Sequence, residues 1–340
     1  MSRAVSQRLT EFAAVMSCFM LLGCSQGVEP VQETPRGVSI ERVGNMNDVA
    51  KQLTGPKLFL LGSGYPDTVA YDRYLKGVIN GESSDVTVVA ASLPSGDSST
   101  PECDLLNGLD SVNSCTTVTV VSAAGANSDA VVNAIQQSGT VYFAGGNQCS
   151  YMNWRGSRLM DAVSQLFERG GGVGGGSAGL AIQAEWVYDG CTGSVRSMEA
   201  LENPYDPRIS LSPGVFSWPM LPGFITDSHF SERDRLGRLI AFQARIMEEQ
   251  ESLSWFGIGL DDESAVIVDK HGEASVFGGD TYVLNTTRPA DTLNQGVPLS
   301  IDSVKVYRFT PGERFQLAAP SLSAEARIYR VDDGVLKSEP

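Results

Sequence analysis

A serine stands at the centre of a glycine-rich segment. Residues 171–179 read GGVGGGSAG, so Ser177 is the serine of a G-x-S-x-G pattern. Between a strand and a helix this pattern forms a sharp turn that exposes the serine, and the flanking glycines avoid clashes with both elements. A helix beginning near Ala178 would direct free N–H groups at the Ser177 oxygen. The pattern predicts a nucleophile. A glycine loop that packs a helix on a sheet and a phosphate-binding loop are the alternatives, although the P-loop ending G-K-[ST] is missing.

A histidine lies in a second segment with polar and basic neighbours. Residues 226–238 read TDSHFSERDRLGR and follow the apolar run 221–225, so we expect His229 at the end of a strand. An imidazole can take a serine proton at neutral pH, and arginines offer planar donors for carboxylates. The segment therefore predicts a general base beside an acidic substrate, with a solvated helix face as the alternative.

A third segment, FAGGNQ at 143–148, follows a predicted strand. Ligands of open α/β sheets bind at the carboxyl ends of the strands, and two glycines leave backbone N–H groups accessible to a substrate carbonyl. An ordinary strand-to-helix turn is the alternative.

The elements that must position these segments alternate along the chain. Apolar runs closed by turn residues predict buried strands at 57–61, 85–91, 117–123 and 140–144, with helical spacing at 71–80 and 129–138. Such alternation predicts an α/β fold with a mostly parallel sheet flanked by helices. After residue 250 the runs are short and separated by turns, one of them at 269–272. They predict antiparallel strands at 255–260, 265–269, 274–277, 282–285 and 303–309.

Taken together, the segments resemble the cyanophycinases and the related serine exopeptidases of the S51 type, which include aspartyl dipeptidase. The resemblance runs from about residue 57 to 285. It rests on four motifs in the same order: G-G-x-Q, G-G-S-A-G, D-x-H-F-S-x-R-x-R-x-G-R and G-I-G-x-D. It implies a fold like that of class I glutamine amidotransferases, with serine in place of cysteine.

The resemblance assigns roles to individual residues. Ser177 falls on the nucleophile and His229 on the base. The acid, a glutamate in the family, falls on Asp262, while Glu263 lies one position further along. An aspartate reaches about one methylene less far than a glutamate, so the choice between Asp262 and Glu263 stays open. In the mechanism that follows, the N–H groups of Ala178 and Gly146 hold the oxyanion.

The family's substrate pocket is kept in part. The resemblance implies that an aspartyl group is bound by Gln148, Asp227, Arg233, Arg235 and Arg238. The chain departs from the family pattern at Asn147, Ser228, Glu232 and Asp234. Two added carboxylates beside Arg233 could weaken its hold on an acidic substrate.

The expected activity is that of a serine-type peptidase that cleaves aspartyl or β-aspartyl bonds in a peptide or a cyanophycin-like polymer. It needs no metal and no organic cofactor. The resemblance also allows a homodimer.

Two other classes of protein stay open: an exported esterase or amidase, and a non-catalytic surface module with the same fold. The net charge of −15 argues against nucleic-acid binding, which requires a basic face.

The N-terminus reads as a targeting segment. Arg3 and Arg8 precede an apolar run at 12–22, and the segment ends in Leu-Leu-Gly-Cys at Cys24, like the lipobox of bacterial lipoproteins. We expect a signal peptide at 1–23 and a lipid on Cys24. A flexible tether at 24–55 and a single domain at 56–340 would follow. The protein would then be anchored in the cell envelope, at the outer membrane.

Four cysteines remain after the targeting segment, an even number that suits disulfides in an oxidising compartment. Three pairings are possible. Cys103–Cys115 is preferred because it closes a short loop, which leaves Cys149–Cys191, with four free thiols as the alternative.

Overall fold

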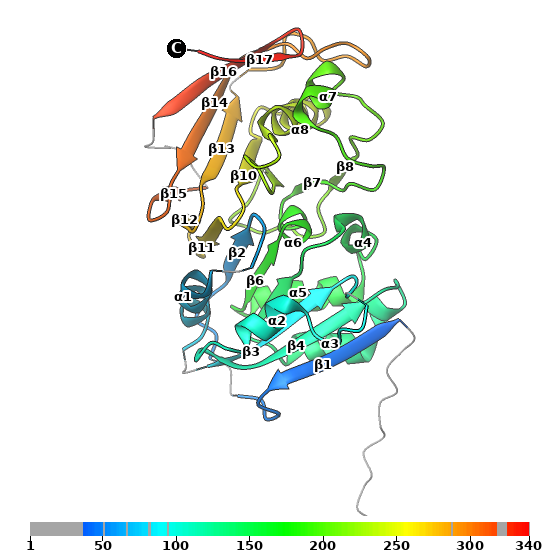
Figure 1. The fold of residues 1–340 in the computed structure, drawn as a ribbon, viewed down its shortest axis with the longest axis vertical. Coiled ribbons are helices and arrows are strands. Elements are labelled where there is room, and N and C mark those ends of the chain that lie inside the picture. The colour runs from blue at the N-terminus through cyan, green and yellow to red at the C-terminus, as the bar shows by residue number, and fades with distance from the viewer. Residues whose placement is uncertain are drawn as a thin grey trace, which may run out of the picture. The chain divides into compact units, whose positions relative to one another are not determined.

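The computed structural model describes residues 37–49, 52–65, 67–80, 83–93, 95–286, 288–317 and 325–339. The predicted signal peptide, Cys24 and residues 25–36 of the predicted tether lie outside these residues. Residues Thr34–Pro340 form one compact unit, drawn in Figure 1. None of the helices in the described ranges has the length and apolar character that a membrane span requires.

A nine-stranded sheet holds the first half of the unit, in the order β1-β4-β3-β5-β6-β2-β11-β12-β15. Its five central strands are parallel, and the strands outside them are antiparallel. The bounds are β1 Val38–Gly44, β2 Lys57–Leu61, β3 Ser84–Ala90, β4 Val112–Val120, β5 Thr140–Phe143, β6 Gly172–Gly176, β11 Ala265–Val268, β12 Glu273–Phe277 and β15 Arg314–Gln316.

Helices cover both faces of this sheet. Alternate residues of β2 point to opposite sides: Phe59 and Leu61 pack in one core cluster with α1 and α2, while Leu58 and Leu60 pack in another with α3 and α5. Capping by Asp67, Ser128 and Ser157 starts α1, α3 and α5. The bounds are α1 Thr68–Val78, α2 Pro101–Leu106, α3 Asp129–Gln136, α4 Gln148–Met152, α5 Arg158–Glu168 and α6 Ala178–Ala181, with a 3₁₀ turn at Gly125–Asn127.

An eight-stranded sheet holds most of the second half, in the order β17-β16-β14-β13-β10-β9-β7-β8. Only the pairs β9–β10 and β7–β9 are parallel in it. The bounds are β7 Trp186–Tyr188, β8 Leu211–Pro213, β9 Phe224–Asp227, β10 Phe256–Leu260, β13 Thr281–Thr286, β14 Ile301–Phe309, β16 Ala326–Asp332 and β17 Val335–Ser338, with the helices α7 Ser197–Glu202 and α8 Leu236–Glu249.

The α/β class is therefore right, but the expectation of one mostly parallel sheet is wrong, because the chain forms two mixed sheets. The pairs β11–β12 and β16–β17 are joined by connections too short for the crossover that a parallel pair requires, so these strands pair antiparallel. The predicted tether also needs correction. Val38–Gly44 is β1, which pairs along its whole length with β4.

The segments that contain the candidate site residues follow the carboxyl ends of parallel strands in both sheets. In the nine-stranded sheet Leu61 of β2 lies beside Gly176, the last residue of β6, and Ser177 follows. In the eight-stranded sheet β9 and β10 end close together, with Asp227 beside Gly259. The segment after β10 then leads into β11 of the other sheet. The carboxyl ends of parallel strands from both sheets thus contribute to one region.

Both preferred disulfides are present. Cys103 is bonded to Cys115, and Cys149 is bonded to Cys191. The alternative of four free thiols is therefore excluded.

Candidate active site

Ser177 occupies a sharp turn between β6 and the short helix α6. Its backbone has φ 51° and ψ −106°, a conformation that few non-glycine residues adopt. The motif requires glycines because neighbouring backbone segments leave no room for a Cβ atom at these positions. A Cβ on Gly175 would lie 2.4 Å from the carbonyl carbon of Gly179, and a Cβ on Gly179 would lie 2.0 Å from the oxygen of Phe143. The packing of α6 against β5 and β6 thus fixes the serine in place.

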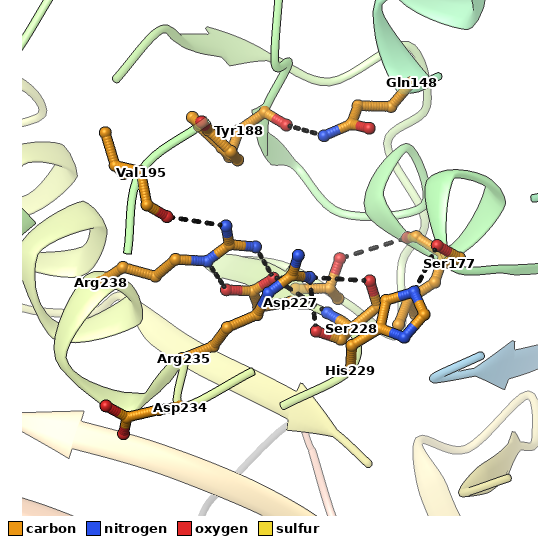
Figure 2. A network of polar contacts seen from close by, with 12 residues as sticks. Gln148, Ser177, Tyr188, Val195, Asp227, Ser228, His229, Asp234, Arg235 and Arg238 are labelled. Atoms are coloured by element: carbon orange, nitrogen blue, oxygen red, sulfur yellow. Dashed lines mark hydrogen bonds and ion pairs between the residues drawn. The ribbon is translucent and has the colours of Figure 1, made fainter. Parts of the chain in front are cut away.

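Three side chains form a chain of close contacts at this turn. The Oγ of Ser177 lies 3.1 Å from Nε2 of His229, as Figure 2 shows. On the other side of the ring, Nδ1 of His229 lies 2.6 Å from Oδ1 of Asp262. Serine, imidazole and carboxylate therefore stand in the order that nucleophile, base and orienting acid require.

The acid in contact with the imidazole is Asp262 rather than its neighbour. Glu263 adopts the left-handed φ of 64°, and its N–H donates to the carbonyl of Ser63. Of the two acids that the sequence left open, the turn that follows β10 brings Asp262 into contact with the imidazole. Figure 1 shows this turn between β10 and β11.

Backbone and side-chain bonds join the His229 loop to the segment after β10. The N–H of Phe230 donates to the carbonyl of Leu260 at 3.0 Å, and the N–H of Ser231 donates to Oδ1 of Asp261 at 2.8 Å. The N–H of Asp262 donates to Oε1 of Glu232 at 3.0 Å. Glu232, treated above only as a departure from the family, thus helps to place the acid.

The surroundings of His229 favour its neutral form. Burial lowers the pKa of the imidazole below its usual value, and the guanidinium of Arg233 lowers it further, while the carboxylate of Asp262 opposes both effects. A neutral imidazole is the form that can accept a proton from Ser177.

Ser177 and His229 face a cavity of about 420 Å³. Within the described ranges, the N–H groups of Gly146 and Ala178 form no hydrogen bond, so both can donate to a group in the cavity. The other polar residues on its wall include every substrate-binding residue predicted from the sequence: Gln148, Asp227, Arg233, Arg235 and Arg238.

These residues differ in how they are bonded. Arg238 is 3% exposed, and its Nε donates to Oδ2 of Asp227 at 2.7 Å while its Nη1 donates to the carbonyl of Val195 at 3.2 Å. Arg235 donates to the carbonyl of Ser228 at 2.7 Å and to Asp227 at 3.3 Å. Figure 2 shows this network. Burial lowers the pKa of Arg235 to about 10, so it stays charged at neutral pH.

Arg233 is different, because its side chain is exposed and has no ion pair or hydrogen bond with any described residue. The two added carboxylates, Glu232 and Asp234, do not form ion pairs with it in the described part of the chain. The guanidinium of Arg233 can therefore bind a ligand in the cavity, whereas that of Arg238 is bonded to Asp227.

The start of α4 and the loop that follows β7 form the cavity wall that faces this network. Gln148 donates through Nε2 to the carbonyl of Tyr188 at 3.1 Å. Asp189, which carried no motif in the sequence, accepts hydrogen bonds from the N–H of Cys191 at 2.9 Å and from Oγ of Ser212 at 2.7 Å. Its role in holding the loop after β7 could not be read from spacing, because Ser212 lies on β8. Across the described ranges, no group of three or more histidine, cysteine or acidic side chains is placed to hold a metal ion.

No family model matches the chain. The cyanophycinase of Trichormus variabilis is 26% identical over 187 residues, which are 52% of this chain and 56% of that protein. The cyanophycinase of Synechococcus elongatus is 25% identical over 189 residues, 52% of each chain. The chain thus spans about half the length of the curated relatives it matches.

The fold also has a counterpart of known structure. The crystal structure of a peptidase from an acI-B1 Actinobacterium superposes with a TM-score of 0.50 at 15% identity, covering 78% of this chain and 97% of that one. Over half of its length the chain is therefore similar in sequence to cyanophycinases, and over most of its length it shares the fold of a peptidase.

Proposed function

We propose that this chain is a serine-type peptidase that cleaves aspartyl or β-aspartyl peptide bonds. The observation that carries the proposal is the contact chain from Ser177 through His229 to Asp262, at 3.1 and 2.6 Å, on the wall of one cavity. The similarity to cyanophycinases supports the hydrolytic reading over that of a binding module.

The proposed reaction proceeds through an acyl-enzyme. His229 accepts the Ser177 proton through Nε2 as Oγ attacks the peptide carbonyl. The free N–H groups of Gly146 and Ala178 stabilise the oxyanion. His229 then protonates the leaving amine, and water hydrolyses the ester on Ser177 with His229 again acting as the base.

The charges on the cavity wall support an acidic substrate. The guanidinium of Arg233, which has no ion-pair partner among the described residues, can bind a carboxylate, while Arg235 and Gln148 offer further donors. Asp227 and Arg238 lie behind them as a buried bidentate pair that supports the wall. Because its relatives are named cyanophycinases, we propose that the first substrates to test are cyanophycin and short β-aspartyl peptides.

Replacing the nucleophile tests the proposal directly. Ser177→Ala removes the attacking oxygen, so we expect kcat to fall by a factor of about 10⁴ or more while the fold is kept. Product masses from cyanophycin and a panel of aspartyl dipeptides would measure this, with wild type and His271→Ala as controls. His271 is the other histidine of the chain and lies on the exposed β11–β12 turn. Full turnover by Ser177→Ala would exclude the mechanism.

We also propose that the protein is exported and anchored by a lipid on Cys24. The two disulfides support an oxidising compartment, and the Leu-Leu-Gly-Cys sequence supports lipidation. Metabolic labelling with a fatty-acid analogue should mark the wild type in the membrane fraction and should not mark Cys24→Ala.

A further inference from the structure

The two disulfides have different surroundings. Cys103 and Cys115 are each 0% exposed and lie within the core between α2 and β4. Cys191 is exposed and Cys149 is half-buried, so their bond can be reached from solvent. Accessible disulfides exchange with thiols, whereas an attacking thiolate cannot reach a buried one without opening of the fold.

The accessible disulfide joins the first turn of α4 to the loop that follows β7, and both segments contribute to one wall of the cavity. Cys149 directly follows Gln148, and Cys191 directly follows Gly190. The two segments touch beside the cavity, because Gln148 donates to the carbonyl of Tyr188 and a Cβ on Gly190 would lie 2.9 Å from Nε2 of Gln148. Figure 2 shows the Gln148–Tyr188 bond.

The loop at 190–193 lies between two anchored ends. Asp189 accepts hydrogen bonds from Oγ of Ser210 and of Ser212, and the carbonyl of Ser194 accepts one from Arg208 at 3.5 Å. Between these ends the loop contains Gly190 at φ 63° and Gly193 at φ 133°, and residues 191–194 are exposed. Besides the disulfide, this stretch is held by the bonds from the Cys191 N–H to Asp189 and from Oη of Tyr188 to the carbonyl of Gly193. Glycines with positive φ have wide conformational freedom, so a covalent link contributes strongly to the order of such a loop.

We propose that the Cys149–Cys191 disulfide is a redox-sensitive positioning element of the active site, an inference that rests on the proposed function. When oxidised, it holds Gln148 against Tyr188 and so pre-forms the substrate-binding wall. When reduced, it lets the wall loosen and weakens capture of the peptide. A dithiol supplies the two electrons. Its first thiolate attacks one cysteine sulfur and breaks the S–S bond, and its second thiolate resolves the mixed disulfide. The products are two cysteine thiols and the oxidised dithiol.

Limited reduction of the folded protein tests this inference. Wild-type protein is treated with dithiothreitol, alkylated and digested, and mass spectrometry identifies the modified cysteines. We expect Cys149 and Cys191 to be modified before Cys103 and Cys115. The KM for an aspartyl peptide should then rise about two- to tenfold, the cost of immobilising one side chain on binding, with kcat changing less.

The double variant Cys149→Ser/Cys191→Ser is the matched control. It should show the raised KM without any reductant and should not respond to added dithiothreitol. Unchanged KM after selective reduction, or a loss confined to kcat, would overturn the inference. Global unfolding on selective reduction, seen by circular dichroism, would also overturn it, because the disulfide would then be required for the fold as a whole.

Hydrogen exchange separates this inference from the proposed function. Selective reduction should speed amide exchange at residues 147–152 and 188–194 and leave α5 and β3 unchanged. If the oxidised protein cleaves no aspartyl peptide, the proposed function fails, and the exchange result alone decides whether the disulfide positions the wall.

Discussion

The carboxylate that faces His229 belongs to an aspartate, which lies 2.6 Å from Nδ1 although its side chain is shorter than a glutamate's. Residues 260–262 are hydrogen-bonded to the His229 loop through the carbonyl of Leu260, the side chain of Asp261 and the N–H of Asp262. These bonds hold Asp262 close enough for its short side chain to reach the imidazole.

Replacing each of the two neighbouring acids gives the prediction at this position. Asp262→Asn removes the charge that orients and stabilises the imidazolium, so kcat should fall about 10²- to 10⁴-fold. Glu263→Gln should keep activity within about threefold of wild type, because no contact joins Glu263 to His229 in the described part of the chain. Steady-state kinetics on one aspartyl peptide would measure both. The reverse ranking would identify Glu263 as the acid.

The lowered pKa of His229 predicts the pH dependence. Protonation removes the base, so kcat/KM should fall on acidification with a midpoint below about 6.5, the ordinary histidine value. Arg233 contributes to the lowering, so Arg233→Ala should move the midpoint upward, whereas Arg233→Lys keeps the charge and should move it less. A wild-type midpoint above the ordinary value would contradict this account.

At the scale of elements, the ends of strands and the glycines between them decide where the chemistry lies. Gly179 packs so closely on Phe143 of β5 that Gly179→Ala should destabilise the fold by about 4 kcal/mol or more. Gly156→Ala is the matched control. Gly156 has φ 70° but open space around it, so the cost should be about 1–2 kcal/mol. Urea unfolding followed by circular dichroism would measure both, and equal costs would show that the close packing is unimportant.

The elements also show what the sequence can and cannot disclose. The apolar run at Lys57–Leu61 and the glycine spacing around Ser177 are local signals, so both β2 and the turn were predictable. β1 was missed because Val38–Gly44 is only half-buried and follows a proline-containing polar stretch, which is typical of a tether. The hairpin β16–β17 was missed as well, because it is largely exposed and therefore has no apolar run.

No short stretch of the sequence indicates which distant strands pair with each other. Short apolar runs do not say which strands become neighbours, and so the division into two sheets was missed. The same limit applies to the acid: Asp262 and Glu263 are adjacent, and only the turn after β10 makes one of them face the imidazole. The order of the motifs predicted the candidate site residues, whereas their relative positions depend on long-range packing.

At the scale of the whole molecule, one core connects the two sheets. The largest hydrophobic cluster includes Leu58 and Val173 of the nine-stranded sheet together with Phe224 and Ile258 of the eight-stranded sheet. Because both sheets bury side chains in the same cluster, neither can lose its packing without exposing apolar surface of the other.

This shared core predicts a single unfolding transition. Urea curves from far-ultraviolet circular dichroism and from tryptophan fluorescence should coincide. The variant Trp154→Phe/Trp218→Phe leaves Trp186 and Trp255, which lie in the cluster of the eight-stranded sheet, as reporters, and its two curves should also coincide. Two separated transitions would show that the sheets unfold independently.

The division of the reacting groups between two sheets has a consequence for biosynthesis. The proposed nucleophile is translated first, the proposed base some fifty residues later and the proposed acid later still, at positions 177, 229 and 262. A nascent or truncated polypeptide that stops before β9 contains Ser177 but not the imidazole that would deprotonate it. The proposed hydrolytic capacity is therefore gained only late in synthesis.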